Sequence, residues 1–173
     1  MGRYLCLVFA ILVASGCSAK YRTDSFEKPA TGLSKDASFY VILPTDGAYG
    51  GDTYNGSGAA TAQAAAAALL HHVQTVETGQ TPGEDLASAE AHARERGLSY
   101  VFQPIILHWE DRATEWSGIT DKIEVKFSVF STGSAQPVAS SVMHASTKWA
   151  SFGGDHPQDL LPGTAKEFVD QLF

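Results

Sequence analysis

Two alanine-rich segments alternate with short apolar runs, and this alternation constrains the fold more than any other feature of the chain. Residues 57–74 (SGAATAQAAAAALLHHVQ) and 81–97 (TPGEDLASAEAHARERG) are rich in strong helix formers. Apolar runs at 38–44, 74–78 and 98–109 lie before, between and after them, and runs this short predict strands. Because helical crossovers join parallel strands, the sequence predicts three parallel strands with two intervening helices.

The second half of the chain predicts a hairpin and a final helix. Residues 122–130 (KIEVKFSVF) alternate between apolar and polar side chains, as a half-exposed strand does, and 138–149 (VASSVMHASTKW) form the next strand. Residues 164–173 (TAKEFVDQLF) predict a helix. We therefore expect one α/β domain over 38–173, with a mixed sheet of about five strands in the order βαβαβββα and helices packed on it. The run 98–109 is apolar on both faces, so it should be a central strand that helices cover.

The first 16 residues have the pattern of a secretory signal peptide. Arg3 is followed by an apolar run and small residues, and the run is shorter than the roughly 20 residues that a transmembrane helix needs. Residues 14–17 (ASGC) resemble the bacterial lipobox. This resemblance implies that Cys17 is acylated, with palmitate among the expected chains, and begins the mature protein. Ser18 resembles an outer-membrane sorting signal, so we expect a lipid-anchored protein of the outer membrane that faces the periplasm.

The segment after the signal peptide is expected to be unstructured. Residues 17–37 are polar, lack periodicity and contain Pro29 and Gly32, so they predict a lipidated N-terminus followed by a flexible tether. Cys6 is the only other cysteine and leaves with the signal peptide. The mature domain therefore has no disulfide, thiolate nucleophile or cysteine-ligated zinc.

The mature chain is strongly acidic. Removal of residues 1–16 leaves 157 of the 173 residues, with 11 basic and 19 acidic side chains and a net charge of −8. An acidic chain without a basic stripe argues against a nucleic-acid partner and against electrostatic adhesion to anionic lipids. We therefore expect the acyl chains to provide the membrane attachment, and an envelope protein or a cell-wall glycan to be the further partner.

Three motifs resemble one family. They are ILHWEDRATEWSG at 106–118, FGGDHPQDLLP at 152–162 and DGAYG at 46–50. With them the chain resembles a family of bacterial envelope lipoproteins catalogued as the domain of unknown function DUF4823, over nearly the whole mature chain. The resemblance implies a lipoprotein of the outer envelope. It implies no activity, and no catalytic residue can be carried over.

The sequence predicts that three segments meet at one edge of the sheet. Residues 45–56, 108–118 and 149–159 each follow a strand that points the same way, and ligands of open α/β sheets bind outside the carboxyl ends of the strands. All three tryptophans of the chain lie in these segments. The predicted partner-binding surface consists of Tyr49, Tyr54, Trp109, Glu110, Asp111, Arg112, Glu115, Trp116, Trp149, Asp155 and His156.

This edge has three interpretations. The favoured one is a non-enzymatic binding or assembly module, because aromatic side chains and arginine dominate interface hot spots. A structural alternative is that the tryptophans form a small satellite core and that Arg112 pairs with a neighbouring acid to hold the loop. The third is an envelope hydrolase, either a glycan hydrolase or a metal-assisted one, that uses the carboxylates at this edge.

The sequence contains no recognisable catalytic motif. It has no HExxH, GK[ST] or G-x-S-x-G, so we predict no metal site, no cofactor and no enzyme activity. Gly56-Ser57-Gly58 precedes a helix but lacks the third glycine of a dinucleotide-binding loop. Ser57 is instead expected to cap that helix.

Overall fold

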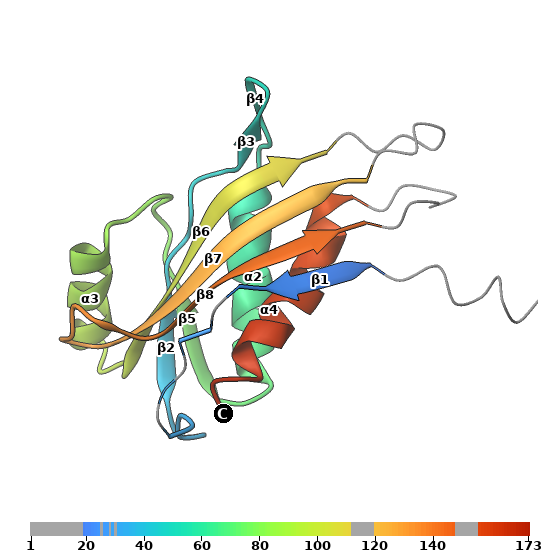
Figure 1. The fold of residues 1–173 in the computed structure, drawn as a ribbon. Coiled ribbons are helices and arrows are strands. Elements are labelled where there is room, and N and C mark those ends of the chain that lie inside the picture. The colour runs from blue at the N-terminus through green and yellow to red at the C-terminus, as the bar shows by residue number, and fades with distance from the viewer. Residues whose placement is uncertain (1–18, 25, 28, 30, 112–119, 148–155) are drawn as a thin grey trace, which may run out of the picture.

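A six-stranded mixed sheet forms the centre of the computed structural model, which describes residues 19–24, 26–27, 29, 31–111, 120–147 and 156–173 (Figure 1). The described elements are, in chain order, β1 (Lys20–Thr23), β2 (Ser38–Val41), β3 (Ala48–Tyr49), β4 (Asp52–Thr53), α2 (Ser57–Leu70), β5 (Thr75–Thr78), α3 (Leu86–Glu95), β6 (Tyr100–Glu110), β7 (Lys122–Ser131), β8 (Pro137–Ser146), the 3-10 helix η2 (Pro157–Leu160) and α4 (Leu161–Val169).

The topology confirms the predicted fold class. The strand order in the sheet is β1-β8-β7-β6-β2-β5. Strand β2 pairs in parallel with β5 and β6, as the two helical crossovers predict. The strands β6, β7, β8 and β1 pair antiparallel in that succession. Strands β3 and β4 form a separate two-stranded ribbon.

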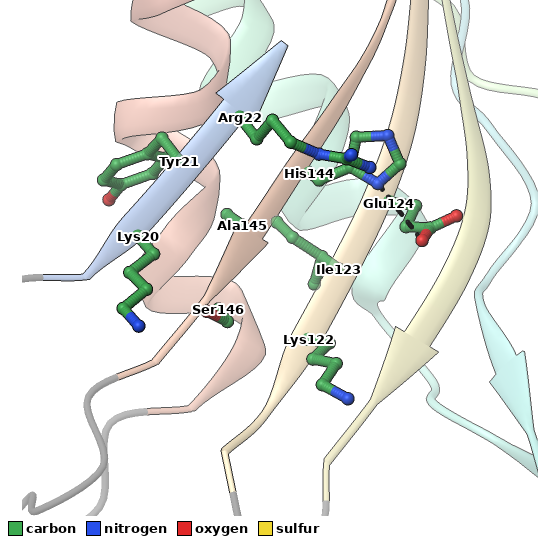
Figure 2. Close-up of a pocket in the computed structure, with 9 residues that line it drawn as sticks. All are labelled: Lys20, Tyr21, Arg22, Lys122, Ile123, Glu124, His144, Ala145 and Ser146. Atoms are coloured by element: carbon green, nitrogen blue, oxygen red, sulfur yellow. Dashed lines mark ion pairs between the residues drawn. The ribbon is translucent and has the colours of Figure 1, made fainter. Parts of the chain in front are cut away.

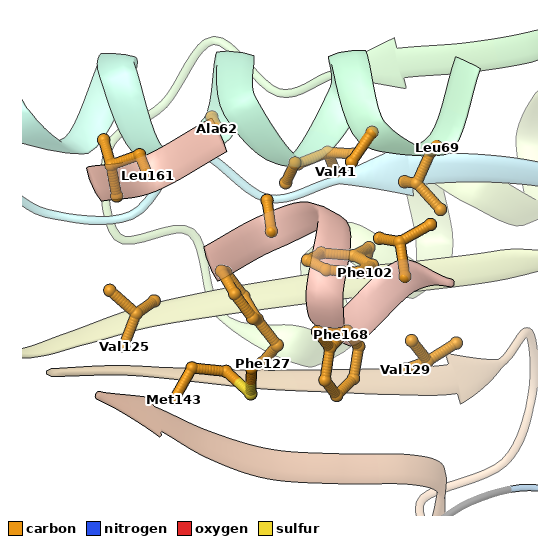
Figure 3. Close-up of a cluster of buried hydrophobic side chains, with 14 of the residues drawn as sticks. Val41, Ala62, Leu69, Phe102, Val125, Phe127, Val129, Met143, Leu161 and Phe168 are labelled. Atoms are coloured by element: carbon orange, nitrogen blue, oxygen red, sulfur yellow. The ribbon is translucent and has the colours of Figure 1, made fainter. Parts of the chain in front are cut away.

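Helices α2 and α4 cover one face of the sheet and enclose the main core (Figures 1 and 3). Phe168 of α4 is fully buried against Phe102 and Phe127 of the sheet, with ring centroids 5.7 and 5.3 Å away. The face of α2 toward the sheet is built largely from small side chains, which allow the helix to approach closely. These are Ala62, Ala65 and Ala68.

The other face of the sheet is covered only at one end. Helix α3 packs over β2 and the beginning of β6, where it buries Tyr40 and Val101. Farther along β6, Ile105 and Leu107 are 39% and 51% exposed. The prediction that helices cover both faces of 98–109 is therefore wrong for these residues, because α3 has only 10 residues and reaches only the start of β6. We call the uncovered surface of β6, β7, β8 and β1 the open face.

The predicted flexible tether is wrong for Lys20–Thr23. These residues form edge strand β1, which pairs antiparallel with β8 from Lys20 opposite Ser146 to Thr23 opposite Met143. Pairing continues at Glu27, which bridges to Ser140. Farther on, the Leu33 N–H donates to the Leu172 carbonyl at 2.7 Å. Most of the described part of the predicted tether is thus attached to the sheet or to the C-terminal end of the chain.

A buried polar cluster attaches α3 and the loop before it to the sheet. The Tyr40 hydroxyl donates to Glu84 Oε2 at 2.8 Å, and His92 Nδ1 lies 2.7 Å from Glu84 Oε1. The Glu84 side chain is only 5% exposed. Burial, followed by the hydrogen bond to Glu84 and the charge of its carboxylate, raises the pKa of Tyr40 from 10.0 to about 12.

This cluster predicts a loss of stability at alkaline pH. An unfolded tyrosine loses its proton near pH 10, whereas Tyr40 in the folded protein keeps it up to about pH 12. Its contribution is therefore complete below pH 10 and is lost as the pH rises through 12. Urea unfolding over this pH range should show a steeper fall in the free energy of unfolding for the wild type than for Tyr40→Phe. An equal slope in Tyr40→Phe would contradict the assignment.

Candidate functional site

Strands β2 and β5 point the same way as β6 but end beside Phe102, near its start. The carboxyl ends of β6 and β8 lie together at one edge of the sheet, as the pairing directions require. We call it the carboxyl edge. The β3–β4 ribbon rises there beside β6 (Figure 1). Asp111, which follows β6, and His156, which precedes η2, also meet there. His156 Nδ1 lies 3.7 Å from Asp111 Oδ1. The predicted convergence of three segments is thus confirmed for their described residues.

The loop between β2 and α2 is held by two short-range contacts. Asp46 Oδ1 accepts the Gly58 N–H at 2.8 Å, and the Ser57 hydroxyl oxygen accepts the Gly47 N–H at 2.8 Å. The prediction that Ser57 caps α2 is wrong. Gly56 occupies the cap position with a φ of 89°, a left-handed conformation that favours glycine, and the buried Ser57 fixes the loop instead.

Trp109 belongs to the main core and not to an exposed surface. It is 2% exposed and pairs with Ile123, whose side chain faces the helices. The cause is a β-bulge between Ile106 and His108, which places Leu107 as an extra residue in β6. Without the bulge, the two-residue period of the strand would turn Trp109 to the open face. The predicted role of Trp109 in a partner-binding surface is therefore corrected.

Glu110 is also enclosed. It is 3% exposed, and its Oε2 lies 3.1 Å from His108 Nε2. Tyr49 in turn packs edge-on against the His108 ring, with centroids 4.9 Å apart. Glu110 therefore belongs to a buried cluster beside the carboxyl edge and offers no exposed carboxylate, which corrects its predicted place on the surface.

A depression of about 550 Å³ lies at the carboxyl edge. Of the predicted surface residues, Tyr54, Asp111 and the largely buried Trp109 line it, and His156 lies beside Asp111. Asn55 and Gln158 also line it. These two amides were missed, although both lie within the predicted segments 45–56 and 149–159. The predicted residues Cys17, Arg112, Glu115, Trp116, Trp149 and Asp155 lie outside the described residues.

A second, smaller depression of about 230 Å³ lies on the open face, between β1, β8 and β7 (Figure 2). His144 in its lining contacts two carboxylates: Nε2 lies 2.9 Å from Asp24 Oδ2, and Nδ1 lies 3.1 Å from Glu124 Oε1. The hydrogen bond from His144 is the main reason that the pKa of Asp24 is lowered, and Arg22 contributes. Asp24 lies 120 positions before His144, and Glu124 lies on the neighbouring strand, so neither contact could be predicted from local sequence.

The described residues show neither of two common functional features. Their histidine, cysteine and acidic side chains form no group of three or more that could hold a metal ion. Within the same ranges, no helix combines the length and apolar character that crossing a bilayer requires.

The fold defines a class of small α/β domains in which a mixed sheet carries helices on one face and is partly open on the other. The chain belongs to the family described as Domain of unknown function (DUF4823), whose model matches residues 31–172. The family predicted from the three motifs is therefore confirmed. No curated protein sequence matches the chain significantly.

Solved structures from three bacteria share this fold. The PelC dodecamer from Paraburkholderia phytofirmans is 13% identical, with a TM-score of 0.67 over 90% of this chain and 97% of that chain. A DUF330 protein from Xanthomonas campestris is 13% identical, with a TM-score of 0.53 over 82% and 87%. A hypothetical protein from Chlamydia trachomatis is 13% identical, with a TM-score of 0.50 over 78% and 94%. At these identities the likeness shows the fold alone.

The burial of Trp109 leads to a stability prediction. Trp109→Ala should lower the free energy of unfolding by about 3–5 kcal/mol, because it leaves a cavity in the core. Leu107→Ala is a matched control on the same strand, since Leu107 is 51% exposed. It should change stability by less than about 0.5 kcal/mol. Urea unfolding of both variants checks this, and equal stabilities would remove Trp109 from the core.

Proposed function

We propose that the protein is a lipid-anchored component of the cell envelope that works by binding a partner at the carboxyl edge and not by catalysis. The proposal places the anchor in the outer membrane and the domain in the periplasm. The signal peptide, the lipobox-like residues around Cys17 and Ser18 after it support the anchor and the location. Membership of the DUF4823 family supports an envelope protein.

The depression at the carboxyl edge is the observation that carries the binding role. Its lining combines the aromatic side chain of Tyr54 with the amides of Asn55 and Gln158 and the carboxylate of Asp111. Apolar surface with a few polar groups is typical of binding sites. The same groups can bind the backbone of an envelope protein or the hydroxyl groups of a cell-wall glycan, which are the two partners that we propose.

The hydrolase alternative has less support at this edge. Among the described residues, Asp111 is the one carboxylate that lines the depression. Glu110 is buried beside His108 and does not reach that surface. A pair of carboxylates across a substrate is what glycan hydrolysis requires, so the described groups favour binding.

A second copy of the chain is one candidate for the protein partner. The similar PelC protein from Paraburkholderia phytofirmans forms a dodecamer. The exposed Ile105 and Leu107 on the open face give this chain an apolar spot of its own. A self-assembled ring or patch would present many copies of the carboxyl edge to another envelope component.

The anchor predicts a defined mass. Wild-type protein purified from membranes should begin at residue 17 and carry acyl groups, because Cys17 is the one thiol left after cleavage. Cys17→Ser should abolish both acylation and cleavage at that position. Intact-mass spectrometry measures both, and a soluble, unacylated mature form of the wild type would contradict the anchor.

The binding surface predicts where crosslinks form. A photo-reactive amino acid at Asn55 or Gln158, both exposed beside the depression, should give specific adducts in the intact envelope. Gln136 is a matched control, since it lies in the exposed turn between β7 and β8 at the opposite edge. The adduct identifies the partner: twice the chain mass indicates a second copy, another protein band indicates a different protein, and a mass sensitive to glycosidase indicates a glycan. Equal adducts from Gln136, or none from any position, would contradict binding at this edge.

A further inference from the structure

The position of β1 determines how far the domain can lie from its anchor. Strand β1 begins at Lys20, only three residues after Cys17. A fully extended chain spans at most about 3.6 Å per residue, so Cys17 lies within roughly 11 Å of Lys20. Because Lys20 pairs with Ser146, the last residue of β8, this short connection leaves the sheet at the carboxyl edge. If Cys17 carries the acyl chains, as the proposed function holds, the carboxyl edge lies against the bilayer surface.

Two lysines occupy this corner of the open face. Lys20 of β1 and Lys122 of β7 both lie opposite Ser146 of β8, one on each side. Neighbouring strands are about 4.8 Å apart, so the backbones of the two lysines are separated by roughly 10 Å. Figure 2 shows that both side chains extend toward the edge at which β6 and β8 end. A single anionic group placed above Ser146 is therefore within reach of both ammonium groups.

Neither of the two lysines is paired with a described carboxylate, so both ammonium groups can bind an added anion. Among the described residues, neither Lys20 nor Lys122 has an ion-pair partner within 4.0 Å. The nearby acids contact other side chains. Glu110, which lies opposite Lys122 in β6, contacts His108. Asp24 contacts Arg22 and His144, and Glu124 contacts His144 from the other side.

We propose that Lys20 and Lys122, with the Ser146 hydroxyl between them, bind the phosphate of an anionic phospholipid headgroup in the leaflet that holds the acyl chains. The proposal rests on the proposed lipid anchor. A phosphate site at this corner would mean that anionic lipids contact the domain electrostatically despite its net charge of −8, contrary to the expectation from the sequence. The attraction to a charged bilayer falls off within a Debye length of about 8–10 Å, so the charges next to the surface decide the interaction.

The test uses the acylated full-length mature protein in lipid nanodiscs of phosphatidylethanolamine with one quarter phosphatidylglycerol. Native mass spectrometry after release counts the lipids that stay bound. The wild type should retain phosphatidylglycerol over phosphatidylethanolamine by at least about fivefold relative to the nanodisc composition, since each lysine near an anionic surface adds a substantial attraction. Lys20→Gln with Lys122→Gln should remove most of this enrichment. Thermal unfolding should stay unchanged, because both side chains are exposed.

A double variant with the same charge change is the matched control. Lys126 lies on the same face but farther from the edge, and Lys35 precedes β2 at the opposite edge. Lys35→Gln with Lys126→Gln should keep the wild-type enrichment, and an equal loss in this control would overturn the assignment to the corner. Inorganic phosphate, tested in neutral detergent by ³¹P line broadening, should not bind. Its binding there would show a site for free anions and would overturn the lipid assignment.

The anchor is tested separately in the same sample. Intact mass shows whether the chain carries acyl groups. An unacylated chain would contradict the proposed function and remove the basis of this inference with it. An acylated wild type without enrichment of phosphatidylglycerol would overturn this inference alone and leave the anchored binding module intact.

Discussion

The pairing of β6 with strands of both directions is the constraint on which the rest of the structure depends. On one side β6 pairs in parallel with β2, and on the other it pairs antiparallel with β7. The parallel side directs the chain that follows β2 toward the carboxyl edge, where β6 ends, although β2 and β5 themselves end beside the start of β6. The antiparallel side brings the end of β8 and the start of β1 to that same edge. The depression and the chain that leads to Cys17 therefore share one edge because of this single change of direction.

The two faces of the sheet differ in the side chains that they carry. The face under α2 and α4 is closed by aromatic and aliphatic packing around Phe168. The open face carries charged side chains, and strand pairing arranges them in rows across β6, β7, β8 and β1. One such row joins His108, Glu124, His144 and Arg22. Exposed ion pairs contribute little to stability, so this row adds little to the free energy of unfolding.

Much of this architecture could be predicted from local patterns in the sequence. The alternating residues of β7 and the alanine-rich residues of α2 determine their own structure over ten or more positions. Strand β1 could not be predicted, because KYRT is four residues long and exposed for most of its length, and its pairing partner lies more than one hundred residues away.

The candidate site was harder to predict because a single extra residue changes its lining. The bulge at Leu107 reverses the direction of every later side chain in β6. It buries Trp109 and turns His108 to the open face, whereas the composition of the segment suggested the reverse for the tryptophan. The sequence could place Asp111, Tyr54 and His156 at the edge. Strand directions alone are enough for this, and the face of the sheet to which each side chain points is not needed.

The shared edge limits what kind of partner can use the depression. If Cys17 is acylated, as proposed, its distance of at most roughly 11 Å from Lys20 keeps the domain close to the bilayer, whereas a tether of about 20 residues would let it extend farther. A partner that contacts Tyr54 and Asp111 must then approach along the membrane surface, because the depression lies at the same edge of the sheet as the chain that leads to the anchor. A soluble periplasmic ligand would meet the turn between β7 and β8 first, at the far end of the sheet. The geometry therefore favours a partner that is itself close to the membrane, such as another anchored protein or a second copy of this chain.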